Sequence, residues 1–465
     1  MASSSAPPFL VAGIDLATAE VRVTVADGSG RVVARGSAPL AAPDRPRPGS
    51  SQQDASSWWP AVARALREAV AGVDGRIVGV AVSATSGTVV LADGDGEPLG
   101  PAILYDDRRV PPGRRWDLLL DDASPAGGAG RTGRAALHAW HASDLIVAHL
   151  TGAAPPTDWS HALKTGYDPA AGRWTEAATA AGLRPEVLAP ASAAGEVCDT
   201  AAADTGLPAG CPVRLGMTDG CAAQLAAGAD RPGRFVTVLG TTMVVKGTSD
   251  HRLDDPASGV YSHRHPGGWW LPGGASNAGG GSLATRFDKG ALADLDRRAA
   301  ARGPSTTVCY PLAGTGERFP FVADDAEELW TAPPADDVDA YRAVLEGVAF
   351  LERLAFERLG AMGAPLEGPL RAAGAGSRSD VWTAIRATVL DVPIVRALSA
   401  DTAFGACVLA ATGTLHETLR AATDAMVHAA GPEVGPVAEE HDELEAGYRT
   451  FVAALRERGW LPWPG

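Results

Sequence analysis

One aspartate stands at a point where it could do chemistry. Asp219 lies in the run Gly-Met-Thr-Asp-Gly-Cys-Ala-Ala at 216–223, directly before an apolar stretch. An aspartate in that place is typical of a helix N-cap, where the carboxylate accepts the amide protons that the first turn leaves unpaired. The same carboxylate could act as a general base and take a proton from a bound hydroxyl. The stretch alone leaves both roles open.

A second acid ends a predicted strand. Residues 10–14, 21–25 and 31–34 alternate as a three-strand meander, and Asp15 follows the first strand with small and hydroxylated residues after it. Residues 234–246 repeat this pattern of a strand, a turn of small and hydroxylated residues and a second strand, with the turn at Gly240, Thr241 and Thr242. Backbone N–H groups in such turns bind phosphate, although a plain hairpin has the same pattern. The repetition predicts two related halves.

A third turn joins a strand to a helix. Residues 370–373 read as a strand, 374–377 as a glycine-rich turn and 380–390 as a helix, which is a nucleotide-binding arrangement or a simple tight connection. Other apolar patterns predict helices at 56–70 and 341–362 and a second strand pair at 77–82 and 88–91. These are the elements that must position the two acids.

Bulk composition excludes several classes of function. A chain of 465 residues predicts two domains, and it has no apolar run near the ~20 residues of a membrane span. Its net charge of -15 argues against nucleic acid or a membrane surface as partner. Residues 1–9 read as a disordered lead-in without a signal peptide, so we expect a cytoplasmic protein. Five cysteines without CxxC spacing fit reduced thiols, and the His138/His141 and His263/His265 pairs predict surface positions rather than metal sites.

Taken together, the segments resemble the FGGY carbohydrate kinases, which belong to the actin-like ATPase group. The resemblance runs from about residue 10 to about residue 413. Its pieces, in chain order, are residues 13–18 with Arg22, Gln53-Asp54 with Trp58-Trp59, 105–109, 150–152, 216–219, 239–242, Tyr310-Pro311 with 316–320, 345–349, 374–377 and Gly405-Ala406. It implies an α/β fold of two actin-like (ribonuclease H-like) ATPase domains with a central cleft. Residues 10–229 would form the sugar-side domain with the catalytic Asp, and residues 230–465 the nucleotide side.

The resemblance also implies roles for single residues, with ATP and Mg²⁺ as cofactors. Asp219 matches the catalytic base, which would contact the sugar hydroxyl, and Asp15 matches the acid that holds Mg²⁺ through water. The nucleotide side would be formed by Thr18, Gly240, Thr241, Thr242, Gly279, Gly280, Gly374, Gly376 and Ser377. The sugar side would include Thr85, Ser86, Tyr105 and Asp107, with Arg109 completing the last motif. An internal ion pair is an equal alternative for Asp107 and Arg109.

The segment at 83–88 bears on the choice of sugar. It reads Ser-Ala-Thr-Ser-Gly-Thr, where xylulokinases carry Gln-Met-His-Gly and glycerol kinases Asn-Gln-Arg-Glu. With residues 162–168, 260–263 and 273–279 it looks most like the D-ribulose kinase branch. The implied reaction is phosphorylation of D-ribulose at its terminal hydroxyl to D-ribulose 5-phosphate, with D-xylulose as the alternative. The small-molecule partners are the sugar and ATP, and a homodimer stays open.

Three departures from the family pattern leave room for another function. Ala17 and Ala375 replace glycines, and Glu20 replaces a serine near the expected triphosphate. An alanine is strained by ~1 kcal/mol or more only where φ is positive. An idle sugar or nucleotide sensor on the same fold is therefore an alternative, and a filament or chaperone role has only the fold in its favour.

Overall fold

The computed structural model describes residues 7–93, 96–122, 138–180 and 186–461. It divides into two compact units, the first made of Met1–Ala226 with Asp401–Val427 and the second of Ala227–Ala400 with His428–Gly465. The expected domain boundary after residue 229 lies three residues beyond Ala226, where the chain first passes from unit 1 into unit 2. Asp401–Val427 was expected in the second domain but lies with the first, because its helix packs on the first sheet. Most of the expected lead-in lies outside the described residues.

The sheet of unit 1 has six strands in the order β13-β14-β5-β1-β2-β3. The predicted meander is confirmed, because β1 to β3 are antiparallel neighbours. On the other side of β1, β5 and then β14 run parallel to it. The bounds are β1 Phe9–Leu16, β2 Glu20–Asp27, β3 Val32–Pro39, β5 Arg76–Ala84, β13 Ala193–Glu196 and β14 Pro212–Thr218.

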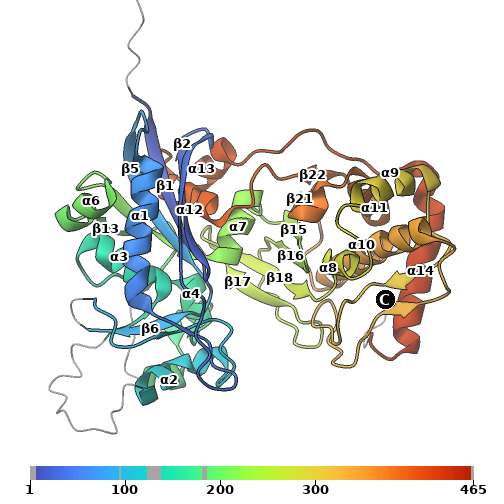
Figure 1. Ribbon diagram of the computed structural model, residues 1–465, viewed down its shortest axis with the longest axis horizontal. Helices are drawn as coiled ribbons and strands as arrows, with labels where there is room; N and C mark the ends of the chain where they lie inside the picture. The colour runs from blue at the N-terminus through green and yellow to red at the C-terminus, as the bar shows by residue number, and fades with distance from the viewer. Residues whose placement is uncertain (1–6, 94–95, 123–137, 181–185, 462–465) are drawn as a thin grey trace, which may run out of the picture. The chain divides into compact units, whose positions relative to one another are not determined.

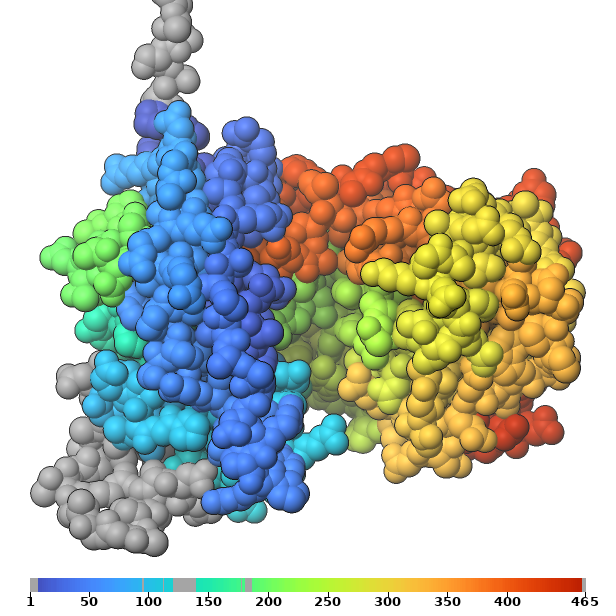
Figure 2. Space-filling model, in the orientation of Figure 1, coloured from blue at the N-terminus to red at the C-terminus, as the bar shows by residue number. Residues whose placement is uncertain are grey.

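Helices pack closely on this sheet where small residues allow it. Helix α12 (Thr402–Ala411) packs on β1, β5 and β14, and a Cβ added at Gly13 of β1 would lie 1.9 Å from the carbonyl oxygen of Ala403. Helix α1 (Trp58–Val70) packs on β2 and β3 (Figure 1). Its apolar face is buried and its arginines are exposed, as expected for an amphipathic helix. The blue segment that contains this helix lies at the surface of the unit in Figure 2.

A smaller sheet in unit 1 has the order β4-β7-β6-β8. The strands expected at 77–82 and 88–91 both form, but they do not pair with each other: β5 joins the large sheet and β6 the small one. The other elements of the unit, with the small sheet, are β4 Gln52–Gln53, η1 Ala55–Ser57, β6 Val89–Ala92, β7 Ala102–Ile103, η2 Pro112–Arg114, α2 Arg115–Asp122, β8 His138–His141, α3 Ala142–Thr151, β9 Thr157–Asp158, α4 Trp159–Leu163, β10 Tyr167–Asp168, β11 Arg173–Trp174, α5 Glu176–Ala180, β12 Val187–Leu188, α6 Asp199–Thr205, α7 Asp219–Ala227 and α13 Leu419–Met426.

The sheet of unit 2 repeats the connectivity of unit 1. Its order is β17-β18-β16-β15-β21-β22, so β15, β16 and β18 correspond to β1, β2 and β3, while β21 and β22 correspond to the parallel strands β5 and β14. The bounds are β15 Phe235–Leu239, β16 Met243–Gly247, β17 Tyr261–Arg264, β18 Trp270–Ser276, β21 Leu370–Ala373 and β22 Ile394–Arg396. The prediction of two related halves is confirmed by this topology.

The helices of unit 2 form a layer around α10 (Asp337–Ala361), with α11 (Asp380–Leu390) and α14 (His441–Glu457) packed beside it (Figure 1). Helix α10 starts before the predicted residue 341 because the Asp336 carboxylate accepts the N–H groups of Val338 and Asp339. The other elements are α8 Gly281–Ala284, α9 Leu292–Arg302, β19 Cys309–Tyr310, β20 Leu329–Trp330, η4 Ala375–Arg378 and η5 Ala438–Glu440. No helix among the described residues is long and apolar enough to cross a membrane.

Candidate active site

The carboxyl ends of three parallel strands meet at one edge of the unit 1 sheet. In the register of the sheet, Asp15 of β1 lies opposite Ser83 of β5, and Thr218 of β14 lies opposite Ala84. The next residues along the chain are Thr85 after β5 and Asp219 after β14. The carboxyl edge is where open α/β sheets bind ligands. The structure therefore brings the two acids predicted from the sequence into one place.

Asp219 is the first residue of α7, so it lies inside the helix and not at the N-cap position that the sequence favoured. Its Oδ1 accepts the N–H of its neighbour Gly220 at 2.7 Å. The N-terminal end of a helix favours the ionised form of a carboxylate. Nevertheless, desolvation by the surrounding protein raises its pKa, against the opposing effects of the N–H groups of Gly220 and Ser86 and the charges of His161 and Arg22. A raised pKa makes Asp219 a stronger base.

Asp15 is fully buried at the end of β1. Its Oδ2 accepts a hydrogen bond from Nε of Arg22 at 3.0 Å. No described residue hydrogen-bonds its buried Oδ1. Burial raises the pKa of Asp15 to about 6, although the pair with Arg22 opposes this. A buried carboxylate oxygen without a protein partner fits a hydrated Mg²⁺, which binds through few carboxylates and keeps several waters. No group of three or more metal-ligating side chains occurs in the described parts of the chain.

Asp15→Asn should make the metal-free protein more stable at pH 7. A carboxyl whose pKa rises from 3.8 to about 6 on folding favours the folded state while protonated. That stability is complete below the unfolded pKa and is lost as the pH rises through about 6. The neutral variant avoids this loss, which amounts to ~3 kcal/mol at 1.36 kcal/mol per pKa unit. Urea unfolding of both proteins without metal from pH 3.5 to 8 should show curves that meet at low pH, whereas a constant difference would contradict the expectation.

The predicted sugar-side residues divide into two groups. No described residue hydrogen-bonds the buried Oγ of Ser86, and Thr85 bonds Thr88 through its hydroxyl at 2.8 Å. Asp107, by contrast, is saturated: its Oδ2 accepts Nη2 of Arg109 and the N–H of Ser51, each at 2.9 Å. The geometry thus favours the internal ion pair for Asp107, while Ser86 keeps a hydroxyl for a ligand.

Arg115 supports the turn after Ser86, a role that no sequence motif indicated. It is buried and donates through Nη1 to the carbonyl oxygen of Gly87 at 2.8 Å and through Nη2 to that of Tyr105. The side chain of Tyr105 is 51% exposed. A buried arginine on two carbonyl groups fixes the turn after Ser86, so Arg115 joins the Thr85–Ser86 turn to the Tyr105 segment.

The turn after Asp15 is supported by Gln53 and is not strained. Nε2 of Gln53 donates to the carbonyl oxygen of Thr18 at 2.9 Å, and Nε1 of Trp58 donates to Oε1 of Gln53 at 2.9 Å. Among the described residues, positive φ occurs outside glycine only at Ala191 and Asp391, so the alanines at 17 and 375 meet no backbone penalty. Glu20 lies 3.6 Å from Nη1 of Arg22, and that cation offsets its charge.

In unit 2 the predicted nucleotide-side glycines interlock. The N–H of Gly280 donates to the carbonyl oxygen of Gly240 at 2.8 Å, and that of Gly281 to Thr241 at 2.9 Å. A Cβ added at Gly279 would lie 2.7 Å from the backbone of Thr242. The turn at 240–242 and the wall at 279–281 therefore touch backbone to backbone, which leaves no room for a side chain at Gly279 or Gly280.

The third segment, 374–377, packs against the end of β15. Gly374 has φ +86, and a Cβ there would lie 2.5 Å from the carbonyl oxygen of Leu239. Oγ of Ser377 donates to the carbonyl oxygen of Gly374 at 2.7 Å, so this serine holds its own turn closed. The predicted strand, glycine turn and helix are confirmed as β21, η4 and α11.

Glu317 anchors the loop that leads into this wall. Its carboxylate accepts Oγ of Ser276 at 2.8 Å, the N–H of Asn277 at 2.8 Å and the hydroxyl of Tyr310 at 2.9 Å, as well as the N–H of Arg318 at 2.8 Å. Burial raises its pKa despite these four donors. The motif containing Glu317 was visible in the sequence, but this function in the nucleotide-side loop was not.

Glu317→Gln should destabilise the protein markedly. The amide keeps one oxygen to accept from the two backbone N–H groups, but the hydroxyls of Ser276 and Tyr310 lose their charged acceptor, and a hydrogen bond to a charged group contributes ~1.5–3 kcal/mol. Thermal unfolding should show a lower Tm and ATP binding should weaken. Glu327→Gln, at an exposed position ten residues away, is the matched control. An unchanged Tm for the Glu317 variant would refute the anchoring role.

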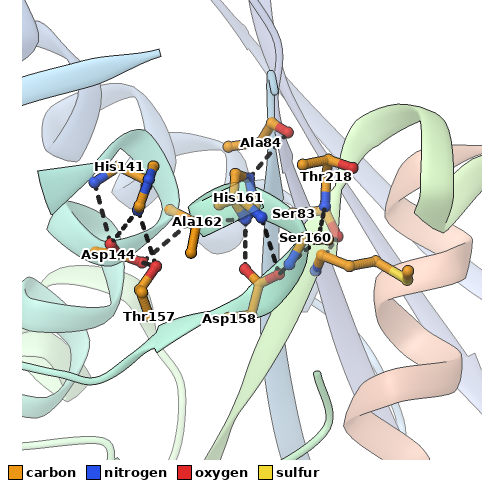
Figure 3. A network of polar contacts seen from close by, with 12 residues as sticks. Ser83, Ala84, His141, Asp144, Thr157, Asp158, Ser160, His161, Ala162 and Thr218 are labelled. Carbon is orange, nitrogen blue, oxygen red and sulfur yellow. Dashed lines mark hydrogen bonds and ion pairs between the residues drawn. The ribbon is translucent and has the colours of Figure 1, made fainter. Parts of the chain in front are cut away.

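The histidines expected at the surface are buried instead. His141, His263 and His265 are at most 5% exposed, and the side chain of His138 lies outside the described set. The expectation was wrong because it rested only on the spacing of possible metal ligands, which does not predict whether a histidine is buried. His141 bonds Asp144 and Thr157 through Nδ1. A second buried histidine, His161, adjoins Asp158, and the nearby Ser160 bonds Thr218, the residue before Asp219 (Figure 3). Neither His161 nor Asp158 was singled out from the sequence.

Comparisons with known proteins agree with this geometry. Two family models match, described as the N-terminal domain (residues 10–113) and the C-terminal domain (residues 235–414) of the FGGY family of carbohydrate kinases. The chain is 29% identical to a xylulose kinase of Streptomyces rubiginosus, over 98% of this chain and 99% of the relative.

Solved structures give the same result. A xylulose kinase from Rhodospirillum rubrum matches with TM-score 0.81 and 27% identity, covering 96% of this chain and 98% of that one. A gluconate kinase from Lactobacillus acidophilus matches with TM-score 0.82 and 18% identity, over 97% and 98% of the two chains, and is evidence for the fold alone. The expected α/β fold with two sheet-rich domains is confirmed.

Proposed function

The chain belongs to the FGGY family of carbohydrate kinases, and from this premise we propose that it transfers the γ-phosphoryl group of ATP to the terminal hydroxyl of a ketopentose, with D-ribulose as the first candidate. It is an enzyme that phosphorylates an alcohol group of a sugar. The observation that supports transfer to a terminal hydroxyl is the position of Asp219. This carboxylate has a raised pKa and lies one residue beyond β14, beside the turn that contains Ser86.

Asp219 is the proposed general base. It would accept the proton of the sugar's terminal hydroxyl as that oxygen attacks the γ-phosphorus. Phosphoryl transfer has a loose transition state, so the hydroxyl becomes acidic late and a carboxylate is strong enough to receive its proton. The raised pKa makes Asp219 more basic than an exposed aspartate.

The remaining residues bind and orient. Asp15, through its unpartnered Oδ1, is the proposed contact to the water shell of Mg²⁺, which when bound neutralises phosphate charge. Thr18 and the turn Gly240–Thr242 would hold phosphate oxygens. Gly279, Gly280, Gly374, Gly376 and Ser377 would form the adenosine side, where only small residues allow backbone to approach the ligand.

Two observations bear on the sugar. The segment at 83–88 lacks the Gln-Met-His-Gly run of xylulokinases and offers the hydroxyl of Ser86 instead, which supports D-ribulose. The similarity to proteins named xylulose kinase over nearly the whole chain supports D-xylulose as the second candidate. These two ketopentoses differ at one carbon, so a few hydrogen bonds decide between them.

A substrate screen tests the proposal. ADP release should be measured with D-ribulose, D-xylulose, L-xylulose, pentitols and gluconate at equal concentration, with Mg²⁺ and ATP. The proposal expects the highest kcat/KM for D-ribulose, followed by D-xylulose. A preference for gluconate or a pentitol would refute the ketopentose assignment, and no phosphorylation of any polyol would favour the sensor alternative.

A further inference from the structure

Beside Thr218, the residue before Asp219, lies a buried polar cluster that the proposed catalysis does not use (Figure 3). It consists of Asp158, the N-cap of the short helix α4, with Ser160 and His161 in that helix. Each of the three is at most 2% exposed. Asp158 accepts the backbone N–H of Ser160 at 2.8 Å and that of His161 at 3.2 Å through Oδ1, while its Oδ2 pairs with Nδ1 of His161. The cluster is thus internally rigid.

Two contacts connect this cluster to the strand ends that carry the active-site residues. Oγ of Ser160 accepts the N–H of Thr218 at 2.9 Å, and Thr218 directly precedes Asp219. Nε2 of His161 lies 3.3 Å from the carbonyl oxygen of Ala84, which directly precedes Thr85. In both bonds a side chain of α4 holds a backbone group at a strand end. The two bonds therefore fix the direction in which the chain leaves β14 and β5.

The geometry also defines the charge of His161. A carbonyl oxygen only accepts, so Nε2 must carry a proton to bond Ala84. Nδ1 faces the carboxylate of Asp158, which accepts as well. Both ring nitrogens are therefore donors, as in an imidazolium. Burial alone would lower the pKa of His161, but the Asp158 carboxylate raises it to about 8.

We propose that Asp158, Ser160 and His161 are positioning residues for the base of the kinase reaction: they hold the ends of β14 and β5 in place, and His161 presents a buried cation to Asp219. The proposal rests on the function assigned above to Asp219. It adds an electrostatic partner that makes this carboxylate easier to ionise than its desolvation alone would allow.

Other charged groups also influence the pKa values of Asp219 and His161, and a test must take them into account. Asp219 also interacts with Arg22, and Asp15 with its pKa of about 6 lies close enough to interact with it. His161 interacts with Asp144 of α3 as well as Asp158, and its ring centroid lies 5.7 Å from that of His141. A shift assigned to His161 must therefore be measured on Asp219 itself, because the pKa of the neighbouring Asp15 is raised as well.

The test compares three variants by kinetics. His161→Asn removes the cation, and we expect the acidic limb of the kcat/KM profile to move up by ~0.5–1 pH unit. We also expect kcat to fall ~10-fold with the sugar KM changed less than ~3-fold, as for a misplaced catalytic group. Ser160→Ala should lower kcat without moving the limb. Thr165→Val, which removes a buried hydroxyl bonded to His141 and to neither strand end, is the control and should change neither.

A second readout does not depend on the sugar. The carboxyl ¹³C resonance of Asp219, identified by its loss in Asp219→Asn, should titrate at higher pH in His161→Asn than in wild type. If wild type phosphorylates no sugar, the proposed function fails while this titration still tests the link between His161 and Asp219. Identical titrations in wild type and His161→Asn would overturn the proposal, as would equal losses of kcat in all variants including Thr165→Val.

Discussion

Asp219→Asn should lower kcat with the best ketopentose by ~10³-fold, within the range that general base catalysis contributes. Asparagine keeps the shape and the contact with the N–H of Gly220 but cannot accept a proton. Because the lost interaction forms only as the hydroxyl is deprotonated, the KM values for sugar and ATP should change less than ~3-fold. Steady-state kinetics with purified variants measure both.

The control for this prediction is Asp199→Asn. Asp199 is exposed in the first turn of α6 in the same unit, so it tests the removal of a helix-start carboxylate without the active-site position. Its kcat should equal that of wild type. If Asp219→Asn keeps most of its turnover while remaining folded, Asp219 is not the base and the assigned mechanism is wrong.

Gly374→Ala should both destabilise unit 2 and weaken ATP binding. An alanine at φ +86 is strained, and its Cβ would lie 2.5 Å from the carbonyl oxygen and 2.9 Å from the nitrogen of Leu239. Backbone strain of ~1–2 kcal/mol and overpacking of ~1–3 kcal/mol add up. We expect a fall in Tm of ~5–10 °C and a rise in the KM for ATP of at least ~10-fold, because the turn must move away from β15.

Gly363→Ala separates the two costs. Gly363 lies in the same unit with φ +99, but an added Cβ meets no atom within 4 Å. It should therefore show the backbone strain alone, with a smaller fall in Tm and an unchanged KM for ATP. Equal effects at the two positions would mean that contact with Leu239 does not shape the nucleotide turn.

Local pattern predicted the strands well because their alternation and turn residues were strong. Strand β1, its turn and β2 formed as expected, and so did the repeated strand–turn–strand pattern at β15 and β16. The pairing of β5 and β6 was wrong, since proximity in sequence says nothing about which sheet a strand joins. The return of Asp401–Val427 to unit 1 has the same cause: α12 is apolar on all sides, and its partner strands β1, β5 and β14 all end before residue 219.

The site was predicted to the extent that it rests on short motifs. Asp15 and Asp219 were visible because Asp15 ends a predicted strand and Asp219 precedes an apolar run, and the register of β1, β5 and β14 brings them to one edge. The buried cluster of Asp158, Ser160 and His161 was not predicted, because its bonds join residues far apart in the sequence. Ser160 and Thr218 are separated by 58 residues, and His161 and Ala84 by 77. The Asp158-Trp-Ser160-His161 spacing is a helix-start signal that could have directed attention there.

The most direct test of the account is the product formed from ATP and D-ribulose in the presence of Mg²⁺. The ³¹P NMR spectrum should show ADP and a sugar monophosphate in equal amounts, with the phosphorus coupled to the two protons of the terminal carbon. Asp219→Asn should form this product at a rate ~10³-fold lower under the same conditions. Inorganic phosphate in place of a sugar phosphate, or phosphorylation at another hydroxyl, would contradict the assignment of Asp219 as the base for the terminal hydroxyl.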